Sequence, residues 1–255
     1  MDLRIGDCLD LMNDLPEDSV DLLFADLPYS QTACKWDCLI DLKEFWRLAN
    51  RVCKPDAPMI FTTTAKFGNL LINSNPKNFR YDLVWIKSAP CGFLNAKKMP
   101  LRKHELIYVF YNKLPSIYTE NITRHHNHKF EGAEPKKSVT FKDIDDTGVY
   151  HEANHASSKN YVGYGKDNNF TIYEPPLPNT IVEAGSERGK HSTQKPVSLM
   201  KWILKYYSKE GAVVLDPTCG SGSMGAACKD MDRFFIGFEK DEKIFDVAFK
   251  RLVDC

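Results

Sequence analysis

The sequence predicts an α/β protein built on a doubly wound, mostly parallel sheet, and two observations carry that prediction. Short, almost continuous apolar runs occur at 20–25 and 212–216, as is typical of strands buried on both faces. These runs alternate along the chain with segments whose apolar residues recur at helical spacing. Alternating strands and helices favour parallel strands joined by right-handed crossovers. The 255 residues suffice for one such domain carrying an insertion.

In the first part of the chain, residues 1–113, apolar runs and β-branched and aromatic residues indicate a series of strands. The predicted strands are 3–5, 20–25, 58–62, 81–86 and 105–111. A helix is predicted over 41–53 and ends at Lys54-Pro55-Asp56, and a shorter helix is expected over 66–74. The apolar face of the longer helix consists of Leu42, Phe45, Trp46, Ala49 and Val52.

The middle of the chain differs in character from both ends. Residues 114–190 are polar and weakly periodic, so we expect a loop-rich insertion there and not a second core domain. Alternation returns in residues 191–255, which supply the second half of the same domain. The elements expected there are a helix over 196–207, a strand over 212–216, a helix ending near 229, a strand over 233–238 and a helix over 244–252.

Composition and charge limit the classes of protein to which the chain can belong. The chain is 43% hydrophobic and 27% charged, as globular proteins are, and no apolar stretch reaches the roughly 18 residues of a membrane span. The N-terminus does not resemble a signal peptide, and the eight cysteines contain no CxxC pair, so we expect reduced thiols and a cytoplasmic protein. The net charge is zero, yet residues 80–113 hold seven Lys or Arg against two acidic residues. That segment fits a nucleic-acid-binding patch or a solvated face.

A glycine-rich segment, Asp216-Pro217-Thr218-Cys219-Gly220-Ser221-Gly222, lies between a predicted strand and a predicted helix. Glycine permits positive φ and lets the backbone approach a ligand closely, and open α/β sheets bind ligands at the carboxyl ends of their strands. After the next strand, Phe238-Glu239 places a carboxylate where it can accept both hydroxyls of a ribose. The spacing departs from GxGxxG, so it indicates a nucleoside-type cofactor or, alternatively, only a tight turn.

The tetrapeptide Asp26-Leu27-Pro28-Tyr29 follows another apolar run and fits activation of an aromatic amino group. Such an amine is a poor nucleophile, and two fixed acceptors for its N–H groups let the nitrogen pyramidalise. The Asp26 carboxylate supplies one acceptor, and the Leu27 carbonyl supplies the other, because Pro28 biases the preceding backbone to extended geometry. Tyr29 offers a ring on which a base taken out of a duplex can stack. A turn rich in Asp and Pro is the alternative.

In these two motifs and their order, the chain resembles the S-adenosylmethionine-dependent amino-methyltransferases of DNA, in the subgroup whose catalytic motif precedes the cofactor motif. Asp26 to Tyr29 matches the family's Asp-Pro-Pro-Tyr with leucine at one position, and Asp216 to Gly222 matches its cofactor loop. The resemblance covers about 1–113 and 190–252. Three further matches are Gly6-Asp7-Cys8-Leu9, Lys103-His104-Glu105 and Thr193-Gln194-Lys195-Pro196.

The resemblance implies a Rossmann-like class I methyltransferase fold and a set of site residues. Asp7 and Cys8 would lie at the cofactor's adenine, Glu239 and Phe238 at its ribose, and Lys195 with the glycine-rich loop at its methionine part. Asp26 is also expected among the residues that contact the cofactor. Residues 114–190 would be the target-recognition insertion. Candidate phosphate contacts are Lys97, Lys98, Arg102, Lys103 and His104, which would give affinity without sequence readout.

These expectations combine into one predicted reaction, methyl transfer from S-adenosylmethionine to the N6 amine of a flipped adenine in a specific double-stranded DNA site. The family uses Asp at the Asp26 position mostly for adenine, and the nearest alternative is N4-cytosine methylation. A nucleotide-dependent oxidoreductase and a catalytically silent DNA-binding protein are the other classes considered.

The histidines 125, 126, 128, 151 and 155 lack zinc spacing, so no metal site is predicted. The sequence leaves open homodimer formation, a separately acting cognate restriction endonuclease and the recognised DNA site.

Overall fold

The computed structural model describes residues 1–29, 38–115, 123–128, 170–174, 178–185 and 194–253. Eight strands form its main sheet. These strands are β1 (Asp2–Ile5), β2 (Leu22–Ala25), β3 (Met59–Thr63), β4 (Phe79–Cys91), β5 (Arg102–Phe110), β8 (Ile181–Glu183), β9 (Val213–Asp216) and β10 (Phe234–Glu239).

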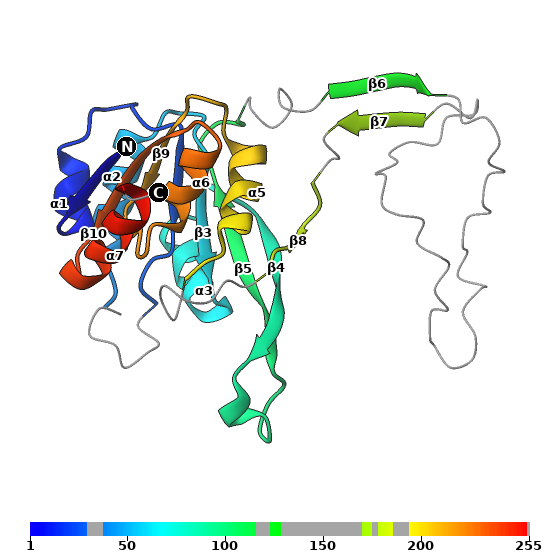
Figure 1. Ribbon diagram of the computed structural model, residues 1–255, viewed down its shortest axis with the longest axis horizontal. Helices are drawn as coiled ribbons and strands as arrows, with labels where there is room; N and C mark the ends of the chain where they lie inside the picture. The colour runs from blue at the N-terminus through cyan, green and yellow to red at the C-terminus, as the bar shows by residue number, and fades with distance from the viewer. Residues whose placement is uncertain (30–37, 116–122, 129–169, 175–177, 186–193, 254–255) are drawn as a thin grey trace. The chain divides into compact units, whose positions relative to one another are not determined.

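The strands lie in the order β1-β10-β9-β2-β3-β5-β4-β8 (Figure 1). Every neighbouring pair from β1 to β3 is parallel, β5 is antiparallel to both β3 and β4, and β8 is parallel to β4. This mostly parallel sheet confirms the predicted fold class. The order also makes β2 and β9 direct neighbours, with Leu23 opposite Leu215, so the ends of two strands far apart in sequence meet at one edge.

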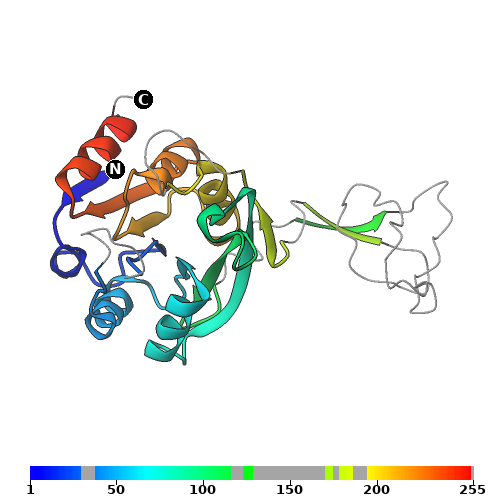
Figure 2. The same cartoon turned by 90° about the horizontal axis from the view of Figure 1, so that it is seen from below.

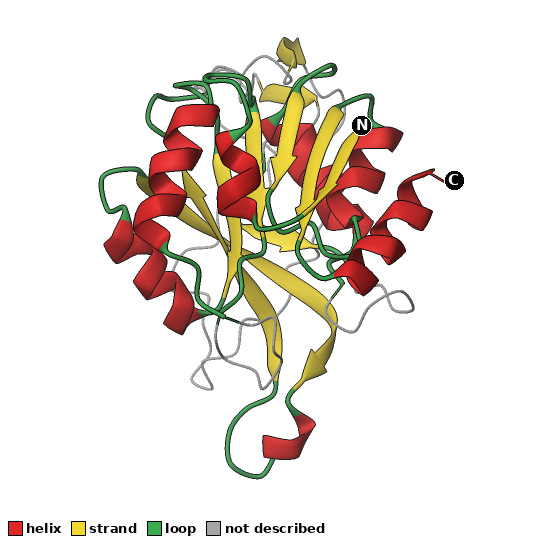
Figure 3. Cartoon of the chain, turned by 90° about the vertical axis from the view of Figure 1, so that its left-hand side faces the viewer, coloured by secondary structure: helices red, strands yellow, loops and turns green. Residues whose placement is uncertain are grey.

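Helices cover both faces of the sheet (Figure 3). They are α1 (Cys8–Asn13), α2 (Leu42–Val52), α3 (Ala65–Ser74), α5 (Val197–Tyr207), α6 (Ser223–Asp230) and α7 (Glu242–Val253). The side chains of β2 alternate between two buried clusters: Leu23 and Ala25 pack with α1, α2 and α3, whereas Leu22 and Phe24 pack with α5 and α6. In Figure 2, α7 lies beside β1, which it contacts. This alternation is the period-two pattern of a strand buried on both sides.

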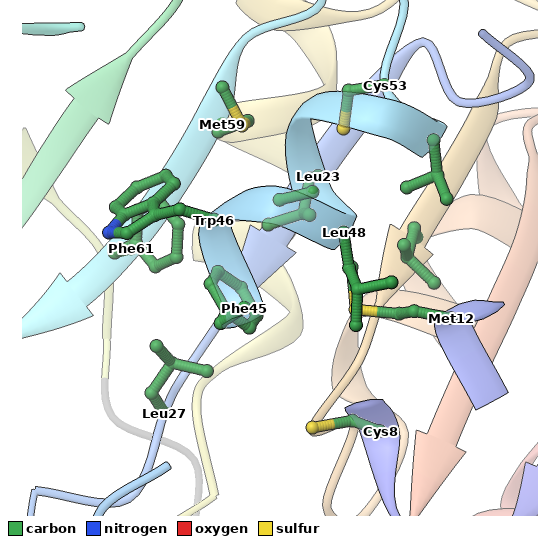
Figure 4. Close-up of a cluster of buried hydrophobic side chains, with 14 of the residues drawn as sticks. Cys8, Met12, Leu23, Leu27, Phe45, Trp46, Leu48, Cys53, Met59 and Phe61 are labelled. Carbon is green, nitrogen blue, oxygen red and sulfur yellow. The ribbon is translucent and has the colours of Figure 1, made fainter. Parts of the chain in front are cut away.

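Helix α2 anchors the first cluster. Asp41 caps its N-terminus by accepting hydrogen bonds from Lys43 N and Glu44 N, which stabilises a helix start by about 1 kcal/mol. Its buried face brings Phe45 and Trp46 against Phe61 of β3, with ring centroids 6.0 and 5.3 Å from the Phe61 ring, and Leu48 lies beside Met12 of α1 (Figure 4). The Trp46 indole donates to Ser74 Oγ at 2.7 Å, so the polar atom of this large side chain is paired.

Three features of the fold differ from the sequence predictions: the β4–β5 hairpin, strand β8 and helix α1. Strands β4 and β5 continue beyond the predicted 81–86 and 105–111 into a long hairpin, which ends in a short 3₁₀ helix, η1 (Phe93–Asn95), and projects from the sheet (Figure 3). Strand β8 lies inside the segment predicted to be loop-rich and pairs Ile181 with Val84. Helix α1 was not predicted, because its six residues are too few to display helical periodicity.

Within the second unit, residues 122–178, strands β6 (Thr123–His128) and β7 (Phe170–Glu174) pair antiparallel. The main unit comprises residues 1–121 and 179–255. His151 and His155 fall outside the described residues. In the part of the chain that the structure describes, every helix is too short or too polar to cross a membrane.

Candidate active site

Asp26 follows the carboxyl end of β2, and both oxygens of its carboxylate are hydrogen-bonded. Oδ1 accepts from the Tyr29 hydroxyl at 2.6 Å and from Thr62 Oγ1, on the neighbouring strand β3, at 2.5 Å. Oδ2 accepts from the ammonium of Lys195 at 2.5 Å. Lys195 lies just before α5 and is 169 residues away in sequence, so the fold itself assembles this cluster.

The charges of the cluster favour an ionised Asp26. Burial alone would raise the pKa of Asp26, but the Lys195 ammonium and the hydrogen bonds from Lys195, Thr62 and Tyr29 outweigh it, so the pKa is lowered. Burial would lower the pKa of Lys195, and the carboxylates of Asp26 and Glu105 outweigh that effect and raise it. Burial and the neighbouring Asp26 charge raise the pKa of Tyr29 well above its usual value. Tyr29 therefore remains a phenol that donates to Asp26.

A second carboxylate, Glu105 on β5, stands on the other side of Lys195. Its Oε2 is 3.7 Å from the Lys195 ammonium, and Oε1 forms an ion pair with Lys87. Oε2 is buried and accepts no hydrogen bond from the residues that the structure describes. The ammonium of Lys87 also lies 5.3 Å from the ring centroid of Trp85. Cation and anion thus alternate from Lys87 through Glu105 and Lys195 to Asp26.

The glycine-rich loop follows β9, beside the end of β2. Gly220 and Gly222 adopt φ values of 52° and 75°, a left-handed conformation that favours glycine. Glu239, at the end of β10, accepts from Gly220 N at 3.1 Å through Oε2 and from Asp241 N at 2.8 Å through Oε1. Because each carboxylate oxygen has two lone pairs, Glu239 retains acceptor capacity toward the space in front of the loop.

Asp7 and Asp216 occupy contrasting environments at this end of the sheet. Asp7 caps α1 by accepting from Leu9 N at 3.0 Å, and Lys240 donates to its other oxygen at 2.8 Å and lowers its pKa. Burial raises the pKa of Asp216 well above its usual value, and a hydrogen bond from Thr218 N opposes that rise. Asp7 is therefore an ionised acceptor, whereas Asp216 is held in a low-dielectric setting.

One pocket of about 1120 Å³ joins the two halves of the site. The tetrapeptide 26–29, Lys195 and Glu105 line it, together with Asp7, Cys8, residues 216–221 and 238–239. Gly222 does not line it: a Cβ there would lie 3.2 Å from Leu252 Cδ1, so this glycine serves packing. The sheet thus brings nearly all residues of the two predicted motifs to one cavity.

The cofactor end of the pocket fits a nucleoside with an attached amino-acid group. A Cβ at Gly220 would meet nothing within 4 Å, so the backbone there faces open space that a ligand can fill. The buried Thr218 Oγ1 has no hydrogen-bond partner among the described residues. With the acceptors of Glu239 and Asp7 nearby, the residues present suit the hydroxyl, amine and charged groups of such a cofactor.

The predicted phosphate contacts lie on the β4–β5 hairpin. Lys97 and Lys98 follow η1, and Arg102, Lys103 and His104 lie on β5; all five are exposed. Of these five, Arg102 alone lines the pocket. The sequence did not identify Thr62 and Lys87 as site residues, because neither belongs to a recognised motif. Glu105 was identified only as part of the segment Lys103-His104-Glu105 that matches the family.

The sheet and the helices on its two faces have the class I methyltransferase fold, and solved structures share this fold. M1.HpyAVI in complex with SAM superposes with a TM-score of 0.61 at 21% identity, covering 98% of this chain and 99% of that one. The cytosine-N4-specific PvuII DNA methyltransferase gives a TM-score of 0.63 at 13% identity, covering 99% and 86%. At these identities the likeness establishes the fold.

The chain belongs to the DNA methylase family of N6 and N4 methyltransferases, whose model matches residues 20–250. S-adenosylmethionine is the cofactor of this family. The type II methyltransferase M.HinfI of Haemophilus influenzae is 28% identical over 269 residues, covering 97% of this chain and 67% of that protein. M.HindIII of Haemophilus influenzae is 44% identical over 66 residues, which are 26% of this chain and only 21% of that relative.

Proposed function

We propose that this chain methylates the N6 amine of an adenine in double-stranded DNA. The observation that carries the proposal is the ionised Asp26, which opens on the same pocket as the glycine-rich loop. When bound, S-adenosylmethionine supplies an electrophilic methyl group. Aspartate at this position supports adenine over cytosine, by the family's usual pattern.

The residues of the chain orient and activate the amine. The Asp26 carboxylate accepts one N–H of the amine, and the Leu27 carbonyl accepts the other, so that the lone pair is directed at the methyl group. As the N–C bond forms, the bond between the methyl group and the cofactor's sulfonium sulfur would break and leave a neutral thioether, and the nitrogen would become cationic and lose one proton. Asp26, held ionised by Lys195, is the adjacent acceptor for that proton.

Oδ2 of Asp26 accepts one hydrogen bond among the described residues, from the Lys195 ammonium, so its second lone pair can accept an N–H of the incoming amine. Oε2 of Glu105, which accepts no hydrogen bond from the described residues, lies 3.7 Å from that ammonium and can accept from it after a displacement of about 1 Å, given a hydrogen-bonded distance near 2.8 Å. A shift of this size makes room for the amine while Lys195 stays close to both carboxylates, so neither buried charge loses its partner.

Nucleoside mass spectrometry tests the proposal. Wild-type protein and Asp26→Asn would each be incubated with S-adenosylmethionine and unmethylated genomic DNA, which is then digested. We expect N6-methyladenine from the wild type and a loss of roughly 10²-fold or more with Asp26→Asn, comparable to removing one preorganised hydrogen-bonding group. Cofactor affinity by calorimetry should change little, since Asp26 acts on the amine.

Each outcome decides one part of the proposal. N4-methylcytosine in place of N6-methyladenine would overturn the base assignment and keep the mechanism. Wild-type rates from Asp26→Asn would overturn the role of Asp26. A wild-type chain that binds the cofactor but modifies no DNA would overturn the proposed reaction itself.

A further inference from the structure

The end of the β4–β5 hairpin exposes apolar side chains that the proposed chemistry does not use. All ten residues 91–100 are exposed, and residues 92–99 form the hairpin tip. Leu94 is 101% exposed, Phe93 66% and Met99 59%. Large apolar side chains gathered at one projecting point on a soluble protein mark a contact surface.

The hairpin tip has a defined backbone shape. Gly92, with φ 93°, turns the chain out of β4, and Asn95 N donates to Gly92 O at 2.9 Å. Lys98 N and Met99 N both donate to Asn95 O, at 2.8 and 3.0 Å. The helical turn at the hairpin's end is visible in Figure 3. Phe93 and Leu94 are therefore held outward by a closed turn.

The charge around the hairpin tip fits a polyanion. Residues 83–104 contain no Asp or Glu, and Lys97 and Lys98 lie within the hairpin tip itself. Arg102 and Lys103 follow on β5. A contact with a second copy of this chain through the same tip would bring the lysines of both copies together, whereas phosphates would neutralise them. The chemistry of the surface favours DNA.

The hairpin also runs continuously into the catalytic pocket. Lys87 to Cys91 on β4 and Arg102 on β5 line the pocket that contains Asp26. Beyond that lining, the same two strands carry the hairpin tip. DNA that delivers a base to Asp26 therefore meets this hairpin next to the point from which the base left the duplex.

We propose that the hairpin tip is a wedge, and that Leu94 and Phe93 insert into the base stack as the target nucleotide leaves it. Apolar side chains inserted between base steps unstack them, and the basic residues nearby hold the backbone on either side. The inference rests on the proposed function, because it assumes a base taken out of the duplex. It adds specific residues that keep the duplex open.

The test compares methylation of two duplexes that carry the site mapped with the wild-type protein. In one duplex the target base is paired, and in the other it lies opposite an abasic position, so that no base pair must be broken. The variants are Leu94→Ser, Phe93→Ser and the control Leu70→Ser, an exposed leucine of α3. We expect Leu94→Ser and Phe93→Ser to lose roughly 10- to 100-fold in kcat/KM on the paired duplex, the scale of the energy needed to flip a base. Both should recover most of that loss on the abasic duplex, and Leu70→Ser should match the wild type on both.

The possible failures are distinct. Equal losses on both duplexes, or no loss on either, would overturn the wedge while leaving the methylation reaction intact. If sedimentation shows a wild-type dimer that Leu94→Ser converts to a monomer, the hairpin tip is an interface between copies and the proposal is wrong. A wild-type chain that methylates neither duplex would overturn the proposed function and the wedge with it.

Discussion

Replacing Lys195 by methionine removes the charge that keeps Asp26 ionised while nearly preserving the shape of the side chain. At the Nζ–Oδ2 distance of 2.5 Å, an effective dielectric constant of ~20 gives an attraction of about 7 kcal/mol. The desolvation of both charges offsets much of this, and removing one partner of a fully buried pair costs about 3–5 kcal/mol. The Asp26 side chain is 27% exposed. We therefore expect Lys195→Met to lose about 2–3 kcal/mol of unfolding free energy at neutral pH.

The pH dependence follows from the direction of the Asp26 pKa. In the wild type this pKa is lowered, so the ionised Asp26 contributes stability above its ordinary pKa, and the contribution is lost as the pH falls through the folded value. In Lys195→Met burial prevails and raises the pKa, so Asp26 destabilises the fold at neutral pH and protonation relieves it. The stability difference between the two proteins should shrink from pH 7 toward pH 4.

Urea unfolding at several pH values measures the free-energy difference, and the pH profile of kcat measures the catalytic consequence. The acid limb of that profile should move to higher pH in Lys195→Met, since Asp26 must be ionised to accept the amine. The control is Lys201→Met, which breaks the solvent-exposed pair with Asp230 and should cost less than about 1 kcal/mol. A Lys195→Met protein as stable as the control, with an unshifted acid limb, would refute the reasoning.

Three further predictions concern other groups of the site. Thr62→Val should lower kcat roughly tenfold, because a hydrogen bond to a charged acceptor contributes about 1.5–3 kcal/mol. The control is Thr63→Val. Thr63 is equally buried, but its hydroxyl donates to the Thr64 carbonyl, so this variant should keep near-wild-type kcat. Glu239→Gln should weaken S-adenosylmethionine binding by calorimetry about tenfold, and an unchanged affinity would remove Glu239 from the cofactor site. In native protein at pH 8, a thiol reagent followed by peptide mass spectrometry should label the exposed Cys38 and Cys91 before Cys8 and Cys228, because burial raises the pKa of Cys8 and of Cys228 to about 12. Labelling of Cys8 or Cys228 before Cys38 and Cys91 would contradict this.

Much of the site could be predicted from the sequence because its two motifs follow strands that are buried on both faces. The apolar runs before Asp26 and Asp216 identify β2 and β9 without a structure. Since parallel strands present their carboxyl ends at one edge, residues after those runs belong to one site. The family's model confirms the resemblance that these motifs carry.

The rest of the cluster depends on tertiary contacts that no local pattern encodes. Thr62 is one of three consecutive threonines, and only the pairing of β3 with β2 brings its hydroxyl to Asp26. The partnership of Glu105 with Lys195 likewise depends on where β5 enters the sheet. The long hairpin escaped prediction because Pro90 and Gly92 interrupt its strand pattern. Strand β8 has three residues, and Val182 alone among them is buried.

The distance in sequence between Asp26 and Lys195 also orders events during synthesis of the chain. At about 5–20 residues per second, roughly 10–30 seconds pass between translation of the carboxylate and of the ammonium that neutralises it. During that interval β2 also lacks its neighbour β9, so one of its edges is unpaired. A nascent or truncated chain therefore holds the aspartate without the environment that makes it useful. The catalytic site is therefore complete only late in translation, and an incomplete chain cannot methylate DNA.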